Sequence, residues 1–316
     1  MPRKKTRRWS HRVKTVSTFP PQSLFTRDAR TIARSMASRR VSPKGIGSGI
    51  RMIQFFINRA GKTLPAAQKK ELEEAKHILQ AKVREVGADL GIAYDGDADR
   101  VGVVDERGRR HEADLILVLL ARDLLSRHPG AQIVFDVKSS QSLIDDIRAH
   151  GGVPVMWKTG HSHLKRKMRE DRILLGGEVS GHMFFAENYY GVDDGILASC
   201  KVIELAARSR GPLSGLFDTV PHLAATPELK AMCPDAEKFR VVAELTQELK
   251  RRYDVIDIDG ARVLFPGGGW GLVRASNTNP YLTLRFEAAT PARIAEMKRV
   301  IYGDLARYPF VTLPAE

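Results

Sequence analysis

Three carboxylates at alternate positions are the feature of this sequence with the clearest chemistry. Asp95, Asp97 and Asp99 lie in one short loop between two short apolar segments. Carboxylates at this spacing can turn their oxygens toward a single hard cation, and an all-oxygen ligand set suits Mg²⁺. A calcium-binding EF-hand needs Gly at its sixth position and Glu at its twelfth, where this chain has Arg100 and Glu106. The EF-hand interpretation therefore fails, and an acidic surface turn is the remaining alternative.

A second polar group, Glu178, Ser180 and His182, follows a short predicted strand. The neighbouring glycines allow a ligand to come close to the backbone, and the three side chains offer hydrogen bonds suited to sugar hydroxyls. Open α/β sheets bind ligands at the carboxyl ends of their strands. Lys138 and His161 follow two other predicted strands, so they could reach the same cleft. The pattern predicts a sugar site, with a plain turn holding a hydrogen-bonded histidine as the alternative.

A third polar segment has the composition of a phosphate cradle. An arginine fork, hydroxyl and amide groups and the free backbone N–H groups of a turn all bind phosphate oxygens. The candidate ligands are Arg274, Ser276, Asn277 and Thr278, with Arg285 further along the chain. Without the first arginine, the Ser, Asn and Pro residues of this stretch would indicate only a loop.

The elements that must position these residues alternate between strands and helices. Strands are predicted over 89–94, 101–104, 132–137, 154–157 and 172–175, and helices over 69–85, 112–127, 140–150, 162–170 and 193–208. Such alternation predicts βαβ units and a mainly parallel sheet with helices outside. The last block, with helix 236–251, strands near 255–258 and 262–265 and a helix from 291, is predicted to be a small α+β domain. The fold class is therefore α/β with a small C-terminal α+β domain.

The net charge of +14 is confined to one end of the chain. Residues 1–70 contain 18 Lys or Arg and one acid, whereas the remainder contains 33 basic and 36 acidic residues, a net charge of −3. The segment 1–65 shows no sustained helical or strand period. We interpret it as a disordered basic tail, with an organelle transit peptide or a non-native sequence left by gene truncation or a shifted frame as alternatives. Aromatic stacking residues are not paired with its charges, which argues against nucleic acid as a partner.

Composition places the chain among soluble globular proteins. Hydrophobic residues make up 43% of it, and no run reaches the roughly 18 apolar residues that a membrane helix needs. Cys200 and Cys233 have no CxxC spacing and no histidine pattern beside them, which argues against disulfides and structural zinc. We therefore expect no membrane partner and a cytoplasmic, reducing compartment.

Taken together and in this order, the three motifs resemble those of the phosphomannomutase/phosphoglucomutase family of α-D-phosphohexomutases. The resemblance runs from about Lys82 to the C-terminus. It implies a remnant of domain 2 with the metal loop over 66–109, domain 3 with the sugar loop over 110–221, and the C-terminal domain with the phosphate loop over 222–316. It also implies Mg²⁺ as cofactor and hexose phosphates as partners, namely mannose or glucose 1- and 6-phosphate and a bisphosphate intermediate.

The resemblance further implies a role for each motif. The three aspartates would hold Mg²⁺ beside a phosphoserine, and Arg100 would face the phosphate that is transferred. Lys138 and His161 would assist near that phosphate. The sugar loop would grip the hydroxyls in two flipped orientations, while the loop from Arg274 to Thr278 would hold the phosphate that is not transferred. Positioning and charge neutralisation are the main requirements of phosphoryl transfer.

One part of the family pattern is missing from these residues. Family members carry a Thr-Ala-Ser-His-Asn-Pro type loop, with the phosphorylated serine, before the metal loop, and no such hexapeptide occurs here. A phosphoryl exchange without its nucleophile has no obvious path. We therefore expect a truncated mutase that is active only with a separate chain supplying the missing domains. The alternative is a non-catalytic remnant that binds sugar phosphates.

Overall fold

The computed structural model describes residues 24, 27–38, 40, 81, 84–277 and 279–314. The predicted helix 69–85 and Thr278 lie wholly or largely outside these residues. The chain divides into two compact units, residues 1–110 and 111–316. Among the described residues, no helix is long and apolar enough to cross a membrane.

The first unit contains helix α1 (Ala29–Ala37) and an antiparallel sheet of β1 (Leu90–Tyr94), β2 (Val101–Asp105) and β3 (Arg110–His111), which ends at the unit boundary. No helix was expected at α1, because nine residues are too few to show a sustained period. The side chain of Asp28 caps this helix by accepting a hydrogen bond of 2.9 Å from the N–H of Thr31. Strands β1 and β2 pair from Leu90 opposite Asp105 to Tyr94 opposite Val101, and the three aspartates lie in their connecting loop.

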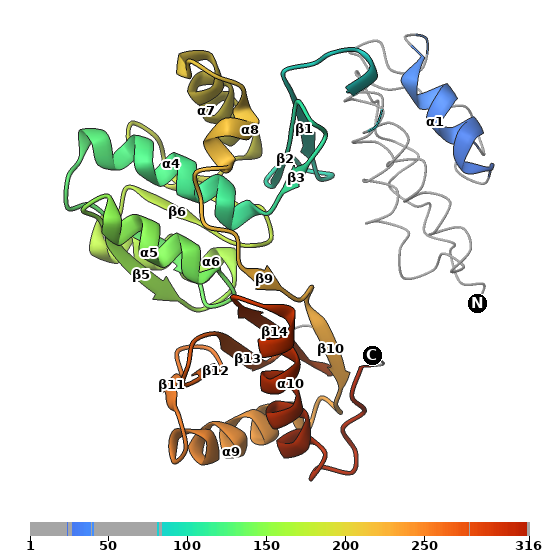
Figure 1. Cartoon of the computed structure of the whole chain (residues 1–316), viewed down its shortest axis with the longest axis vertical. Helices are drawn as coiled ribbons and strands as arrows, with labels where there is room; N and C mark the ends of the chain where they lie inside the picture. Colours follow the sequence, from blue (N-terminus) through green and yellow to red (C-terminus); the bar gives the residue numbers. More distant parts are fainter. Residues whose placement is uncertain are drawn as a thin grey trace, which may run out of the picture. The chain divides into compact units, whose positions relative to one another are not determined.

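The second unit begins with an α/β domain around a mixed five-stranded sheet (Figure 1). Its elements are α4 (Ala113–Arg127), β4 (Gln132–Asp136), α5 (Gln141–Ala149), β5 (Val153–Trp157), α6 (His161–Asp171), β6 (Leu175–Gly177), β7 (Met183–Phe185), β8 (Val192–Asp193), α7 (Gly195–Arg208) and α8 (Leu213–Phe217). The strand order is β5-β4-β6-β7-β8, with β4 parallel to β5 and β6 while β7 and β8 run antiparallel. Val134 of β4 packs on Leu164 and Met168 of α6, which covers one face of this sheet.

One predicted strand begins later than expected. The expected strand 172–175 starts at Leu175, because Arg172 has a positive φ of 57° and caps the end of α6. The N–H of Ile173 then donates to the carbonyl of Met168 at 2.9 Å, which closes the helix before the strand can start. Glu178 consequently follows β6 directly, at the carboxyl end of that strand.

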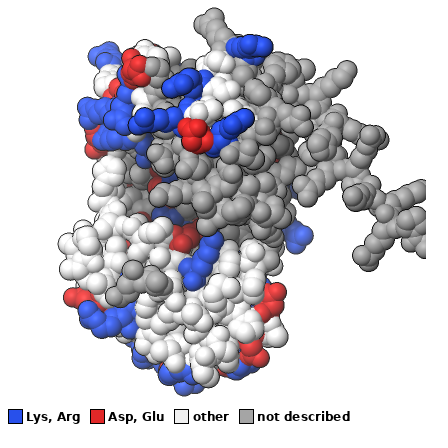
Figure 2. Space-filling model, turned by 90° about the vertical axis from the view of Figure 1, so that its right-hand side faces the viewer, with Lys and Arg blue, Asp and Glu red and all other residues white. Residues whose placement is uncertain are grey.

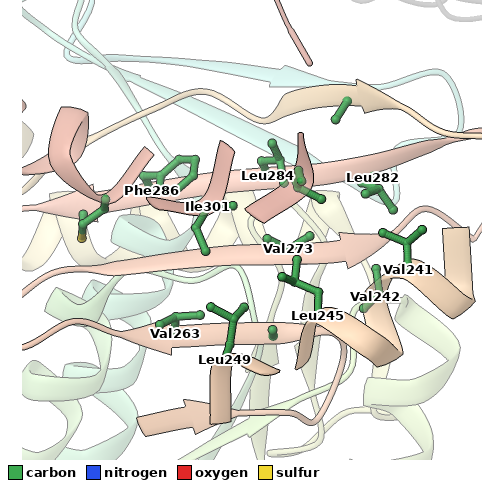
Figure 3. Close-up of a cluster of buried hydrophobic side chains, with 14 of the residues drawn as sticks. Val241, Val242, Leu245, Leu249, Val263, Val273, Leu282, Leu284, Phe286 and Ile301 are labelled. Carbon is green, nitrogen blue, oxygen red and sulfur yellow. The ribbon is translucent and has the colours of Figure 1, made fainter. Parts of the chain in front are cut away.

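The C-terminal domain is an antiparallel sheet with two helices, as expected for a small α+β domain. Its elements are β9 (Ala224–Ala225), β10 (Leu229–Met232), α9 (Lys238–Lys250), β11 (Asp254–Ile256), β12 (Ala261–Leu264), β13 (Trp270–Ala275), β14 (Tyr281–Ala288) and α10 (Pro291–Leu305). The strand order is β10-β14-β13-β12-β11, and β9 pairs with β14. One face of this sheet packs on α9 and α10 through a cluster of aliphatic side chains (Figure 3) that includes Leu245, Val273 and Leu284.

The opposite face of this sheet is also buried, although every second residue on it is polar or charged. Arg274 lies opposite Thr283, and Arg285 lies opposite Leu272, so these side chains share the face that points away from α9 and α10. Arg262 is fully buried there and donates to the carbonyls of Val137 and Ser139, both at 2.7 Å. The α/β domain therefore covers this face with the segment that follows β4.

The surface of the C-terminal domain shows no single-sign field on the side seen in Figure 2. Lys and Arg side chains alternate there with Asp and Glu over the lower part of the view, where this domain lies. The same domain has exposed ion pairs between Arg307 and Glu248 and between Arg293 and Glu296. This agrees with the net charge of −3 after residue 70.

Candidate active site

The metal loop brings its three carboxylates together. Asp95, Asp97 and Asp99 each offer an oxygen, and these atoms all lie within 4.8 Å of one another. Ala98 has a positive φ of 62°, and this left-handed residue turns the chain tightly between the last two aspartates. The loop therefore presents oxygen ligands to a common point, as the alternate spacing predicted, and such a set could hold a hard divalent cation.

Arg100 is bound to the same loop. Its Nη2 lies 2.5 Å and its Nε 2.7 Å from Oδ2 of Asp95, and its side chain is 40% exposed. The arginine therefore neutralises one carboxylate of the loop and keeps part of its guanidinium open to solvent. A cation beside a metal loop can contact a phosphate that the metal also contacts.

The sugar loop is tied together by hydrogen bonds among its own polar side chains. Glu178 is buried, and its Oε2 lies 2.9 Å from Nδ1 of His182, while Oγ of Ser180 lies 2.9 Å from the same nitrogen. The Oε1 of Glu178 accepts a bond of 2.6 Å from the N–H of Gly160. Burial opposes ionisation of Glu178, but the hydrogen bonds from His182 and Gly160 outweigh it and lower the pKa of this carboxyl. The loop thus presents a fixed carboxylate beside a hydroxyl and an imidazole.

Lys138 is held between two carboxylates from different domains. Its Nζ lies 2.5 Å from Oε1 of Glu228 in the C-terminal domain and 3.7 Å from Oδ2 of Asp136 in the α/β domain. Burial opposes the positive charge, but Asp136 and Glu228 together raise the pKa of Lys138. The charge of Lys138 also helps to lower the pKa of Glu178. Lys138 is therefore a cation whose charge acts on the sugar loop.

The first arginine of the phosphate loop is buried and aimed by a carboxylate. The Nε of Arg274 donates to Oδ2 of Asp259 at 3.0 Å, and the same oxygen accepts a bond of 3.0 Å from the N–H of Thr159. Its Nη2 is buried and has no hydrogen-bond partner among the described residues. Ser276 is buried and its Oγ accepts from the N–H of Asn279 at 3.3 Å, whereas Asn277 is exposed.

Arg285 lies deeper, in the face shared by the two domains. Its Nη2 is 3.8 Å from Oδ2 of Asp114, and its Nε is buried without a hydrogen-bond partner in the described part of the chain. The charge of Arg285 helps to lower the pKa of Glu228, which stands one residue before β10. Arg285 therefore interacts with the carboxylate that contacts Lys138.

His161 lies at the start of α6, close to the sugar loop. Its ring stacks on the ring of His182 with centroids 5.5 Å apart, and its Nδ1 lies 3.4 Å from Oδ2 of Asp193. The other oxygen of Asp193 accepts from Nζ of Lys165 at 2.8 Å. Asp193 therefore positions His161, whose side chain is 51% exposed.

Within the second unit the structure connects the sugar loop with His161 and Lys138, and Lys138 contacts Glu228, on which the charges of Arg274 and Arg285 act. These contacts do not include Ser276 or Asn277. The carboxylates that connect them were not predicted, and they are Asp136, Asp193, Glu228 and Asp259. Asp136 could have been found, because it lies near the end of the predicted strand 132–137, two residues before Lys138. Glu228 lies before the predicted helix 236–251, outside every predicted strand and helix, where the sequence carries no signal of its function.

Two family models match this second unit. The phosphoglucomutase/phosphomannomutase alpha/beta/alpha domain III matches residues 112–223, and the C-terminal domain of the same family matches residues 228–303. The chain belongs to the phosphoglucomutase/phosphomannomutase family. The resemblance stated from the three motifs is thereby confirmed. A further model, of a protein family of unknown function (DUF3175), matches residues 8–84.

Curated relatives of this chain are named phosphomannomutase/phosphoglucomutase or phosphoglucomutase. The phosphomannomutase/phosphoglucomutase of Pseudomonas syringae is 45% identical over 246 residues, which is 77% of this chain and 52% of the relative. The phosphoglucomutase of Neisseria gonorrhoeae is 42% identical over 239 residues, 75% of this chain and 52% of the relative. The chain thus spans about half the length of the curated relatives that it matches.

A solved structure shows the same fold. The phosphoglucomutase/phosphomannomutase family protein of Burkholderia thailandensis superposes with a TM-score of 0.67 at 40% identity, over 75% of this chain and 51% of that chain. The α/β fold with a smaller C-terminal domain, predicted from the alternation of elements, is therefore confirmed.

Proposed function

We propose that this chain carries the metal, sugar and phosphate sites of an intramolecular phosphotransferase that interconverts hexose 1-phosphates and hexose 6-phosphates. One observation carries the proposal: the sugar loop around Glu178 and the cations Lys138, Arg274 and Arg285 are linked within residues 111–316, through Lys138 and Glu228. A phosphorylated sugar requires hydrogen-bonding groups for its hydroxyls and cations for its phosphate at one site. The names of the relatives, which share 42–45% of aligned residues, support the same activity.

The sugar loop binds the hydroxyls of the ligand, and the phosphate loop binds one of its phosphates. Glu178 is ionised, so it accepts hydrogen bonds from two sugar hydroxyls, and Ser180 and His182 add a donor and an acceptor. Arg274 and its loop hold the phosphate that does not react, which converts remote binding energy into positioning of the other end of the sugar. A 1-phosphate and a 6-phosphate then bind in two orientations, with a bisphosphate between them.

Mg²⁺ is the cation that we assign to Asp95, Asp97 and Asp99, because the donors are all oxygens. When bound, it supplies charge neutralisation to a phosphoryl group in transfer. Arg100 shares that task from the same loop, since its guanidinium is half open while Asp95 fixes its direction. Lys138 and His161 serve the reacting phosphate as further cationic and hydrogen-bonding groups. The compartment that we assign is the cytoplasm, in keeping with two free cysteines.

Turnover, in this proposal, needs a phosphoserine that these 316 residues do not provide. A phosphoserine would pass its phosphoryl group to the free hydroxyl of a bound hexose monophosphate, and the other phosphate of the bisphosphate would return to the serine. We assign that serine to a separate chain. A sugar-phosphate-binding remnant without turnover is the second candidate, and the missing hexapeptide is the observation that favours it.

Calorimetry on the purified chain tests the binding half of the proposal. Glucose 1-phosphate and mannose 6-phosphate should bind, glucose should not, and Arg274→Met should weaken binding by roughly 10- to 150-fold, the equivalent of about 1.5–3 kcal/mol for a charge-assisted hydrogen bond. Arg240→Met, which removes the same side chain from the outer surface of α9, is the control and should change nothing. If neither sugar phosphate binds, with or without Mg²⁺, both candidate functions are wrong.

A coupled mutase assay on the same preparation tests the catalytic half. The chain alone should show no turnover of glucose 1-phosphate, and chelation of divalent ions with EDTA should then make no difference to that rate. Turnover after addition of a phosphorylated serine domain from a relative favours the separate-chain proposal, and its absence favours the remnant. Full activity of the chain by itself would contradict the missing-nucleophile argument.

A further inference from the structure

A cavity of about 300 Å³ lies beside α6, within the α/β domain. It is formed by α6, by the segment that joins α6 to β6, and by the turn between β7 and β8. Small-molecule sites in proteins occupy about 300–1,000 Å³, so this cavity has room for one small ligand. None of the described residues of the sugar loop or the phosphate loop lines it. The cavity is therefore separate from the candidate active site.

Three cations line this cavity, and no acid among the described residues does. Lys165, Arg169 and Arg172 follow one another at intervals of four and three residues, so they share one side of α6 and of its C-terminal end. Lys165 is already engaged, because its Nζ lies 2.8 Å from Oδ1 of Asp193. Arg169 and Arg172 are exposed, and neither forms an ion pair or a side-chain hydrogen bond within the described part of the chain.

The other acids of the segments around the cavity are paired elsewhere or lie outside its lining. Asp171 pairs with Lys167 at 2.7 Å, and Glu187 pairs with Arg127 at 2.8 Å. Glu170 lies outside the lining. The cavity therefore keeps the charge of its two arginines, and this charge favours an anionic ligand.

Two tyrosines of the β7–β8 turn also line the cavity. The hydroxyl of Tyr189 donates to Oδ2 of Asp194 at 2.6 Å, and Asp194 caps α7, so the ring of Tyr189 is held in place. The ring of Tyr190 lies 5.1 Å from that of Tyr189 between centroids, and Tyr190 is 86% exposed. An exposed aromatic ring offers a face on which a planar ligand can stack.

Backbone hydrogen bonds fix both walls of the cavity. The N–H of Gly191 donates to the carbonyl of Phe185 at 2.7 Å and closes the turn that carries the tyrosines. On the opposite wall, the N–H of Ile173 donates to the carbonyl of Met168 at 2.9 Å and holds the end of α6. The cavity is thus formed before a ligand enters, which lowers the entropic cost of binding.

We propose that this cavity binds a nucleoside monophosphate, whose phosphate contacts Arg169 and Arg172 and whose base stacks on Tyr190. A guanidinium presents parallel donors to phosphate oxygens, and an exposed tyrosine ring accepts a base of any sequence. The volume stands at the lower end of the usual range, which favours a monophosphate over a larger nucleotide. The inference is independent of the proposed function, because it uses no residue of the sugar loop or the phosphate loop.

Calorimetry of the full chain with AMP and GMP, at low salt and without divalent ions, tests this inference. At least one of the two should bind, and it should bind more tightly than its nucleoside or inorganic phosphate, because each of these offers only one half of the ligand. Arg169→Met should weaken nucleotide binding roughly 10- to 150-fold. Arg166→Met, which removes an exposed arginine of the same helix that does not line the cavity, is the matched control and should leave the affinity unchanged.

Tyr190→Ala tests the place of the base and should weaken nucleotide binding roughly 5- to 150-fold. Phe239→Ala, which removes an exposed aromatic ring from α9, is its control, and thermal melting checks that all four variants are folded. If neither nucleotide binds, or if Arg169→Met and Arg166→Met bind equally well, the inference is wrong. Inorganic phosphate that binds as tightly as the nucleotide, or a nucleotide affinity that Tyr190→Ala leaves unchanged, would overturn the assignment of a nucleotide to this cavity.

Discussion

Arg262 is the residue whose replacement should reveal most about how the two domains of the second unit are joined. It is fully buried on β12, its Nη1 donates to the carbonyls of Val137 and Ser139 at 2.7 Å each, and its guanidinium lies 3.7 Å from the ring centroid of Trp270. These contacts fix the segment that carries Lys138 against the C-terminal domain. We expect Arg262→Met to destabilise the protein.

The loss in the free energy of unfolding is the sum of the contacts that Arg262→Met removes, less the cost of the unpaired buried N–H groups that it also removes. Two charge-assisted hydrogen bonds contribute about 1.5–3 kcal/mol each, and the stacking on Trp270 contributes about 1–2 kcal/mol. Against this, Nε and Nη2 of Arg262 are buried with no hydrogen-bond partner in the part of the chain that the structure describes, and burial lowers the pKa of this guanidinium to about 9. Relief of that cost returns about 1–3 kcal/mol, so the net loss should be about 4 kcal/mol, within a range of roughly 1–7 kcal/mol.

Thermal unfolding followed by circular dichroism measures this loss. For a unit of the size of residues 111–316, 1 kcal/mol corresponds to about 2–4 °C, so a loss of about 4 kcal/mol should lower Tm by roughly 8–16 °C. Arg307→Met removes an exposed arginine that pairs with Glu248. It should lower the free energy of unfolding by no more than about 1 kcal/mol, so Tm should change by no more than about 2–4 °C. Equal shifts in the two variants would refute the view that Arg262 joins the domains.

Two further predictions concern the residues that shape the site. Gly260→Ala should lower Tm by more than about 5 °C, because Gly260 has a φ of +84° and an added Cβ would lie 2.3 Å from the carbonyl oxygen of Val273. Gly215→Ala is the control and should leave Tm unchanged, because an added Cβ there has no atom within 4 Å. Equal Tm values for the two variants would contradict this prediction. The pKa of Glu178 is lowered from 4.5, so its ionised form stabilises the fold above that pH, and the benefit is lost as pH falls through the folded value. Glu178→Gln should therefore melt lower than the unmodified chain at pH 7, with the difference shrinking below about pH 4.5; a difference that stays constant down to pH 3 would disprove the assignment.

The sequence by itself determined the local structure and the identity of the loops. Alternating apolar and polar segments predicted the α/β domain, because period and length distinguish strands from helices without knowledge of their neighbours. The alternate spacing of Asp95, Asp97 and Asp99 predicted a set of converging oxygens, because side chains two residues apart in a tight loop can face one point. Errors arose at element ends, as at Arg172, where a single left-handed residue decides where a helix ends.

Only the tertiary structure decided which partners the functional side chains have. Arg274, Arg285 and Glu287 alternate with apolar residues along β13 and β14, yet they are buried because the α/β domain covers the face that they share. Burial removes the water that would screen these charges, so their interactions depend on which distant carboxylate lies nearby. Lys138 and Glu228 are 90 residues apart in the chain and 2.5 Å apart in space. No local pattern encodes such a contact, since it exists only where the two domains pack against each other.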